Sequence, residues 1–143
     1  MRVVLDTNVF ISAFFWDGSP RRVLERAIRG NDELLVCREI LDEIADVMRR
    51  PKFGVDHVFI DYFLKSIEEV ARPASITQPV PEICRDPQDN KILACAVVGG
   101  AEFIVSGDED LLVLKEYSGT KIVSPDDYLN HLRGGGEGRS PER

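Results

Sequence analysis

The sequence has few of the residues on which zinc and thiol chemistry depend. It contains 2 histidines and 3 cysteines, and no two cysteines form a C-x-x-C pair. His57 and His131 each lie in a predicted helix without a Cys or His nearby, which disfavours a zinc site and a histidine-based triad. We expect Cys37, Cys84 and Cys95 to pack as small apolar side chains rather than to form a disulfide framework.

Long apolar runs and basic charge are also scarce. No stretch approaches the ~20 apolar residues of a membrane-spanning helix, and Met1-Arg2 leads into a strand-like run rather than a signal peptide. We therefore expect a cytoplasmic protein without a membrane segment. The 18 basic and 25 acidic residues give a net charge of −7, which argues against nucleic-acid binding unless bound cations neutralise part of the acid.

The chain fits one domain, expected over residues 1–133, because the tail 134–143 (GGGEGRSPER) is too polar and glycine-rich to fold. Strands alternate with helices, which predicts a parallel sheet with helices on both faces. In such sheets ligands gather beyond the carboxyl ends of the strands. Strands are expected at 2–6, 34–37, 102–106 and 121–123, helices at 20–29, 39–50, 56–70, 88–98 and 125–132, and a helical turn at 110–114.

Two aspartates stand at the ends of predicted strands. Asp6 ends the first strand and Asp108 follows the third, so both side chains are expected at the same edge of the sheet. The alternative for Asp6 is a simple turn made with Thr7 and Asn8, and for Asp108 a cap on the turn that follows, a role open to Asp110 as well. The repetition of the pattern at two strand ends favours a shared site.

Asp89 lies at the centre of the apolar stripe of helix 88–98, in line with Leu93. A carboxylate that faces inward must be paired, protonated or bound to a cation. Lys91 is the only basic residue of this helix. The alternative is a first-turn acid favoured by the helix dipole, with Asp86 as N-cap. That alternative explains Asp86 well and Asp89 less well, so we predict a metal ligand at Asp89.

Glu43 is one of four acids on helix 39–50 and lies nearest to its apolar stripe, at the border. It can reach over the edge of the sheet, although a surface role remains the alternative. Four carboxylates in one cleft would repel each other unless a divalent ion were present. Oxygen ligands without Cys or His indicate Mg²⁺ or Mn²⁺, and such ions activate water for phosphodiester hydrolysis.

Four segments in this order resemble the PIN domain family: VVLDTNVFISAF, EILDEIADVMRRPKF, CRDPQDNKILACA and IVSGDEDLL. The resemblance runs from Arg2 to about Leu132 and is nearest to the prokaryotic VapC-like toxins of toxin–antitoxin pairs. It implies a three-layer α/β/α sandwich, Mg²⁺- or Mn²⁺-dependent endoribonuclease activity on RNA, an antitoxin partner and a homodimer. It also implies metal-binding acids at Asp6, Glu43, Asp89 and Asp108, and supporting residues at Asn8, Ser106, Asp110 and Asp86.

Basic side chains near these acids are candidates for holding the RNA backbone. The alternative for the first three is a helix C-terminus complemented by cations. Tyr62 and Phe63 are expected in the core, on an apolar face with Val58, Phe59 and Ile67, rather than stacked on bases. The candidate basic residues are Arg49, Arg50, Lys52, Arg85 and Lys91.

Other enzyme classes fit less well. A phosphorelay receiver needs paired acids after the first strand, and a haloacid-dehalogenase-type phosphatase needs a second Asp two residues after Asp6, where this chain has Asn8. A housekeeping RNA-processing nuclease, and a PIN-like module that binds RNA or protein without cutting, remain as alternatives.

Overall fold

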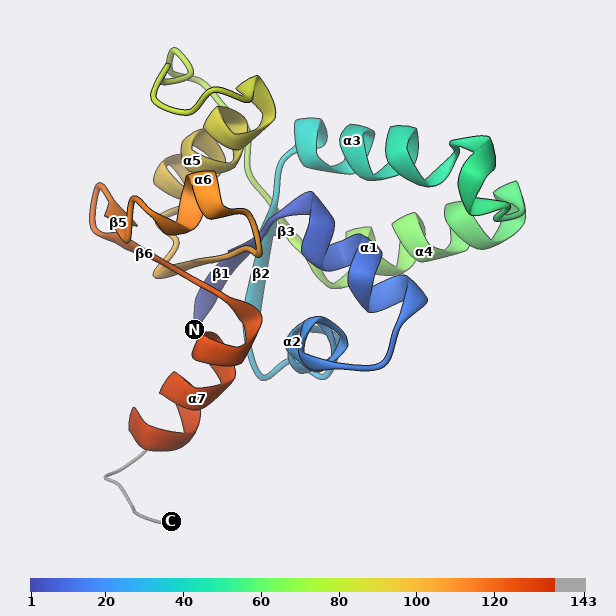
Figure 1. Cartoon of the computed structure of the whole chain (residues 1–143), viewed down its shortest axis with the longest axis horizontal. Helices are drawn as coiled ribbons and strands as arrows, with labels where there is room; N and C mark the ends of the chain where they lie inside the picture. The colour runs from blue at the N-terminus through green and yellow to red at the C-terminus, as the bar shows by residue number, and fades with distance from the viewer. Residues whose placement is uncertain (136–143) are drawn as a thin grey trace.

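The strands form a single six-stranded sheet in the computed structural model, which describes residues 1–135 and the side chains of 1–133. The strand order is β3-β2-β1-β4-β6-β5, and every neighbouring pair is parallel except β5 with β6 (Figure 1). This confirms the predicted mainly parallel sheet. The strands are β1 (Arg2–Leu5), β2 (Glu33–Val36), β3 (Arg72–Pro73), β4 (Phe103–Val105), β5 (Glu116–Tyr117) and β6 (Thr120–Val123).

Helices cover the sheet on both sides. In Figure 1, α1 to α4 lie on one side of the central strands, with α5 and α6 on the other. The helices are α1 (Thr7–Phe15), α2 (Ser19–Ile28), α3 (Arg38–Met48), α4 (His57–Val70), α5 (Pro87–Gly99), α6 (Glu109–Leu112) and α7 (Pro125–Gly135), with a 3₁₀ turn η1 (Pro51–Phe53).

The central strands are buried on both faces, as their continuous apolar sequences require. Val4, Leu5, Ile104 and Val105 have no exposed surface. Helix α5 contacts β1, β2 and β4. It approaches β2 so closely that a Cβ atom at Gly99 would lie 2.6 Å from Cδ1 of Leu35. The missing side chain of Gly99 therefore lets the end of α5 rest directly on the sheet.

Helix α1 was not predicted, because the turn expected at Thr7-Asn8 is in fact the first turn of a nine-residue helix. Its sequence, TNVFISAFF, is apolar on nearly every side, and five of its residues are buried. A helix that is apolar on most of its surface lacks the polar face that makes helical periodicity visible, and its Val, Ile and Phe residues favour strands. The consequence is that Asp6 is the N-cap of α1 rather than part of a loop.

The predicted inner face of α4 is correct for Ile67 and Phe63, which pack on the core, and wrong for Val58, Phe59 and Tyr62. Ile60 and Ile67 are buried, whereas Val58, Phe59 and Tyr62 are 70%, 63% and 73% exposed. Apolar residues occupy both sides of this helix, so the sequence alone could not choose between two stripes that differ by about 100°. Tyr62 is therefore a surface residue and not a core residue.

Two smaller differences concern the last third of the chain. Strand β5 was missed because it has only two residues, and α7 continues to Gly135, past the expected end of the domain. Residues 136–143 lie outside the described part, so the expected disorder there stays a prediction. Within residues 1–135, no helix has the length and apolar character required to cross a membrane.

Candidate metal centre

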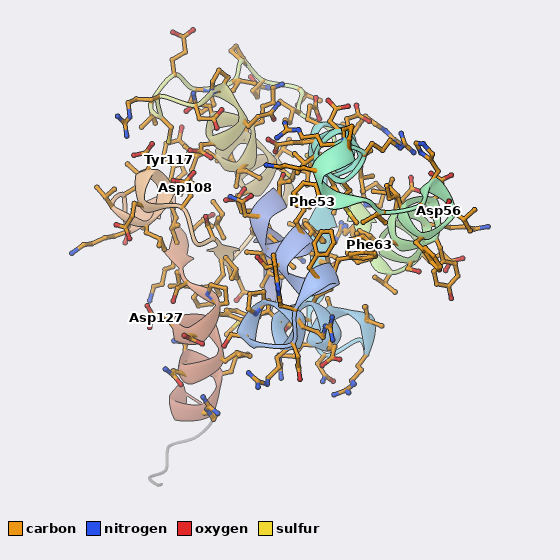
Figure 2. The ribbon with its side chains drawn as sticks, turned by 45° about the vertical axis from the view of Figure 1, so that its right-hand side comes forward. Phe53, Asp56, Phe63, Asp108, Tyr117 and Asp127 are labelled. Carbon is orange, nitrogen blue, oxygen red and sulfur yellow. The ribbon has the colours of Figure 1, made fainter. Side chains whose placement is uncertain are left out.

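Three aspartates from distant parts of the chain meet at the carboxyl edge of the sheet. Asp6 follows β1, Asp108 follows β4 as the N-cap of α6, and Asp89 lies in the first turn of α5. Each offers a carboxylate oxygen, and these oxygens all lie within 4.8 Å of one another. The structure thus brings together three of the four acids predicted to bind metal (Figure 2 shows Asp108).

The sheet topology explains why the cluster forms at this point. Strand β1 pairs with β2 on one side and with β4 on the other, so the connection from β1 runs to one side of it, whereas the later connection from β3 crosses back past β1 to reach β4 on the other side. Such a reversal opens a crevice beyond the carboxyl ends of the two strands, where ligands bind in open α/β sheets. Asp6 and Asp108 line this crevice from its two sides.

Ser106 connects the two strand ends. Its hydroxyl, which is fully buried, donates to Oδ2 of Asp6 at 2.7 Å and accepts the backbone N–H of Asp108 at 2.9 Å. Oδ1 of Asp108 in turn accepts the N–H of Asp110 at 2.9 Å. One carboxylate oxygen of Asp6 and one of Asp108 are held by these bonds, which fixes the orientation of both carboxyl groups.

Asp6 is buried, with 5% of its surface exposed. No basic side chain of the described structure lies within ion-pair distance of it. Burial raises the pKa of Asp6 to about 6, although hydrogen bonds from Ser106 and from the backbone of Thr7 favour the charged form. The nearby charges of Asp108 and Glu43 contribute to this raised pKa. A carboxylate in this position lacks a counter-charge.

Asp89 is the least compensated of the three. It is 4% exposed, and its Oδ2 has no hydrogen-bond partner within residues 1–135. Burial, the adjacent carboxyl group of Asp108 and the charge of Asp6 together raise the pKa of Asp89 to about 8. An unpaired buried carboxylate oxygen that points into a cluster of acids is what a hard divalent cation would satisfy. The three aspartates therefore fit a metal ion.

Glu43, the fourth predicted ligand, lies at the margin of the cluster. Its Oε1 accepts a hydrogen bond of 2.5 Å from the hydroxyl of Thr7, which is 3% exposed, and no oxygen of Glu43 joins the 4.8 Å group. Thr7 was missed in the sequence, where it was treated as a turn residue next to Asp6. Direct metal binding by Glu43 stays a prediction.

The other predicted acids have partners of their own. Asp86 caps α5 by accepting the N–H of Gln88 at 3.0 Å, as the capping alternative proposed. Asp110 accepts two hydrogen bonds from the guanidinium of Arg85, at 2.9 and 3.1 Å. Asn8 is exposed in the first turn of α1. The supporting role of Asn8 therefore stays a prediction.

Most of the predicted RNA-binding cations lie apart from the cluster. Arg49 pairs with Asp61 at 2.7 Å, Lys52 places its Nζ 5.2 Å from the ring centroid of Phe53, and Arg50 is exposed. These three stand at the far end of α3, whereas Lys91 is half-buried on α5. Only Arg85, through Asp110, is connected to the loop that carries Asp108.

Asn90 holds the loop that precedes the site, a role that the sequence did not reveal. Its buried amide oxygen accepts the N–H groups of Ile83 and Cys84 at 3.1 and 2.8 Å, and its nitrogen donates to the carbonyl of Cys84 at 3.1 Å. These bonds tie the connecting loop to the start of α5, next to Asp89. The only available signal was an Asn in the inward-facing first turn of an apolar helix.

Replacing Asn90 with Ala should lower the free energy of unfolding by about 2–3 kcal/mol, because it leaves two loop N–H groups without their acceptor. A thermal melt should show this as a fall in Tm of roughly 5 °C or more. Asn8→Ala removes an exposed asparagine and should change stability by no more than about 0.5 kcal/mol. Equal melting of the two variants would show that Asn90 does not hold the loop.

Comparisons with known proteins agree with this geometry. A family model described as PIN domain matches residues 2–110, which is more than half of the chain and includes all three clustered aspartates. The uncharacterized protein MJ1680 of Methanocaldococcus jannaschii is 31% identical over 119 residues, covering 81% of this chain and 76% of that protein.

Proposed function

The chain belongs to the PIN domain family, and we propose that it is a Mg²⁺- or Mn²⁺-dependent endoribonuclease that hydrolyses RNA phosphodiester bonds. PIN domains are typically metal-dependent nucleases, and the cluster of Asp6, Asp89 and Asp108 supplies an oxygen-only ligand set of the kind these ions prefer. The observation that carries the proposal is the buried Oδ2 of Asp89, which has no partner within residues 1–135.

The bound ion would activate a water molecule, orient the scissile phosphate and stabilise charge on the leaving oxygen. The residues of this chain keep the ligands in place. Ser106 donates to the carboxyl group of Asp6 and accepts the backbone N–H of Asp108, Asp110 N–H holds the carboxyl group of Asp108, and the first turn of α5 presents Asp89. Thr7 holds Glu43 beside the cluster, where we propose that its free oxygen orients the attacking water.

The toxin role is a further part of the proposal and is supported by the resemblance to VapC-like proteins. On this reading, the chain would act with a cognate antitoxin protein and as a homodimer. A housekeeping RNA-processing nuclease would use the same site, so the chemistry proposed for the three aspartates does not depend on which biological role applies. The presence of an antitoxin gene beside this one would favour the toxin role.

The test is cleavage of labelled single-stranded and structured RNAs by the purified protein in Mn²⁺, Mg²⁺ or EDTA. We expect cleavage with either ion, none in EDTA, and recovery when the ion is restored. Asp89→Asn protein, purified in the same way, controls for contaminating nucleases. Cleavage that persists in EDTA, or that the variant retains at the wild-type rate, would contradict the proposed function.

A further inference from the structure

Arg85 is connected to the acidic cluster by a short chain of hydrogen bonds. Its Nη2 donates to both carboxylate oxygens of Asp110, at 2.9 and 3.1 Å. The backbone N–H of Asp110 donates in turn to Oδ1 of Asp108 at 2.9 Å. The hydrogen bond with Asp110, together with the charges of Asp110 and Asp108, raises the pKa of Arg85. The guanidinium group therefore lies at the margin of the candidate metal centre, within range of the charge of one of its ligands.

The backbone on either side of Arg85 is fixed to the helix that presents Asp89. The side chain of Asn90 binds both the N–H and the carbonyl of Cys84, at 2.8 and 3.1 Å. On the other side, Asp86 caps the first turn of α5. Arg85 stands between these two residues, so the position of its backbone is tied to that of Asp89.

Most of the hydrogen-bonding capacity of Arg85 is unused. A guanidinium group has five N–H donors, and within residues 1–135 only those of Nη2 have a partner, which leaves Nε and Nη1 free. The side chain is 87% exposed, and an ion pair with this exposure contributes little to stability. Asp110 therefore holds one part of the guanidinium group while the remaining donors are open to a ligand.

These free donors supply what the three aspartates lack, which is a partner for phosphate oxygens. The carboxylates carry three negative charges and a divalent ion offsets two, so the loaded centre still repels an anionic phosphodiester. Asp110 and Asp86 cancel any excess of positive charge around Arg85, so its contribution lies in directed N–H groups rather than in net charge. Charge-assisted hydrogen bonds from a guanidinium group to phosphate are strong and geometrically specific.

Other basic side chains near this edge of the sheet are turned away or paired elsewhere. Lys91 is two residues beyond Asp89, which places it about 200° around α5 from that carboxylate. Arg38, which follows β2, lies 3.6 Å from Glu68 of α4. Within the described residues, Arg85 is the basic side chain that has both a link to the cluster and donors to spare.

We propose that Arg85 binds the phosphodiester at the metal centre, with Nε or Nη1 donating to a non-bridging phosphate oxygen, and that Asp110 positions its guanidinium group. Asp110 is then a positioning residue and not a metal ligand, in agreement with its place outside the group of three aspartates. Cationic donors held in this way accelerate phosphoryl transfer by stabilising the charge that develops on the phosphate oxygens. The assignment rests on the proposed ribonuclease function and adds to it a residue that contacts the substrate.

Steady-state cleavage of a labelled RNA in saturating Mn²⁺ tests the role of Arg85. Arg85→Gln should lower kcat by about 10²-fold, the loss expected when one donor to a developing charge is removed, while its Tm and its affinity for Mn²⁺ stay unchanged. Added guanidinium should restore part of the activity of Arg85→Ala. The matched control is Arg72→Gln, which breaks a similarly exposed pair with Glu33 at the opposite edge of the sheet and should cleave at the wild-type rate.

A double-mutant cycle tests the role of Asp110. Asp110→Asn should lower kcat by about tenfold without weakening Mn²⁺ binding, because the amide holds the guanidinium group less firmly. In the Arg85→Gln background the same change should have no further effect, since Asp110 acts through Arg85. Weaker Mn²⁺ binding by Asp110→Asn, or a double variant whose two losses multiply, would overturn the role given to Asp110.

Binding of an eight-nucleotide RNA in Ca²⁺, with the RNA shown to stay intact, separates the phosphate contact from the proposed function. Arg85→Gln should bind about tenfold more weakly than the wild type, and Arg72→Gln as tightly as the wild type. Binding that depends on Arg85, in a wild type that does not cleave in Mn²⁺, would support the contact and contradict the ribonuclease function. Wild-type binding and cleavage by Arg85→Gln, or equal losses in Arg72→Gln, would overturn the contact and leave the ribonuclease function intact.

Discussion

The Asp89→Asn variant should lose RNA cleavage and yet melt at a higher temperature than the wild-type protein in EDTA. The amide has the shape of the carboxyl group but carries no charge, so it removes one anion from the metal site. We expect the rate to fall by about 10²–10³-fold, the loss typical of removing one group that stabilises charge in the transition state.

The gain in stability has the same physical origin. When no ion is present, the wild-type protein must either protonate Asp89 or hold it as a buried carboxylate next to Asp6 and Asp108. Each unit by which the pKa of Asp89 exceeds its ordinary value corresponds to about 1.4 kcal/mol. At pH 8 the cost is on the order of a few kcal/mol, so the variant should melt roughly 5 °C or more above the wild type.

Asp86→Asn is the matched control, since it makes the same chemical change three residues away. Asn caps helices as well as Asp does, so this variant should keep its activity and its Tm. Cleavage rates and calorimetric melts in EDTA and in Mn²⁺ measure both effects. If Asp89→Asn melts below the wild type in EDTA and cleaves normally, Asp89 is a structural residue and the metal site is wrong.

The metal-free protein should become less stable as the pH rises from about 4 to 8. Asp6 and Asp89 have pKa values of about 6 and 8 in the folded state, above the 3.8 expected in the unfolded chain. Folding therefore favours their protonated forms. The stability that these groups contribute is fully present below pH 3.8 and is lost as the pH rises through 6 and then 8.

Urea unfolding at pH steps between 5 and 8.5 measures this dependence, and the difference between the wild type and Asp89→Asn isolates it from other titrating groups. Up to pH 8 the difference should grow by no more than about 1.4 kcal/mol per pH unit. Saturating Mn²⁺ should reverse the trend in the wild type, because the ion binds the ionised carboxylates. A wild-type stability that is flat or rises over this range in EDTA would contradict the raised pKa values of Asp6 and Asp89 in the folded protein.

The parts of the site that could be predicted are those with a local signature. Asp89 stands on an apolar helix stripe, and Asp6 and Asp108 stand where strands end, so periodicity and strand signals located all three. The fold class followed from the alternation of strands and helices along the sequence. Helix α5 and its Asp86 cap were correct because Pro87 and the glycine pair at 99–100 mark the helix ends clearly.

The missed parts depend on contacts between segments that are distant in sequence. Thr7 became visible as a partner of Glu43 only when α3 was placed beside α1. Helix α4 has two apolar stripes, and only one of them packs against α1, α2 and α3. The packing of all four helices decides which stripe is buried and which is exposed. The Arg85–Asp110 pair likewise needed the approach of the loop before α5 to helix α6, between residues 25 positions apart.

The hydrogen bond between Ser106 and Asp6 joins residues that are 100 positions apart. During translation, at ~5–20 residues per second, about 5–20 seconds therefore pass between the synthesis of the first aspartate and that of the serine that orients it. Until then β1 has no complete β4 beside it, and a partial chain holds Asp6 without Asp108. A ribosome that makes this protein is thus not exposed to an assembled acidic site on the emerging chain until Asp108 has been added.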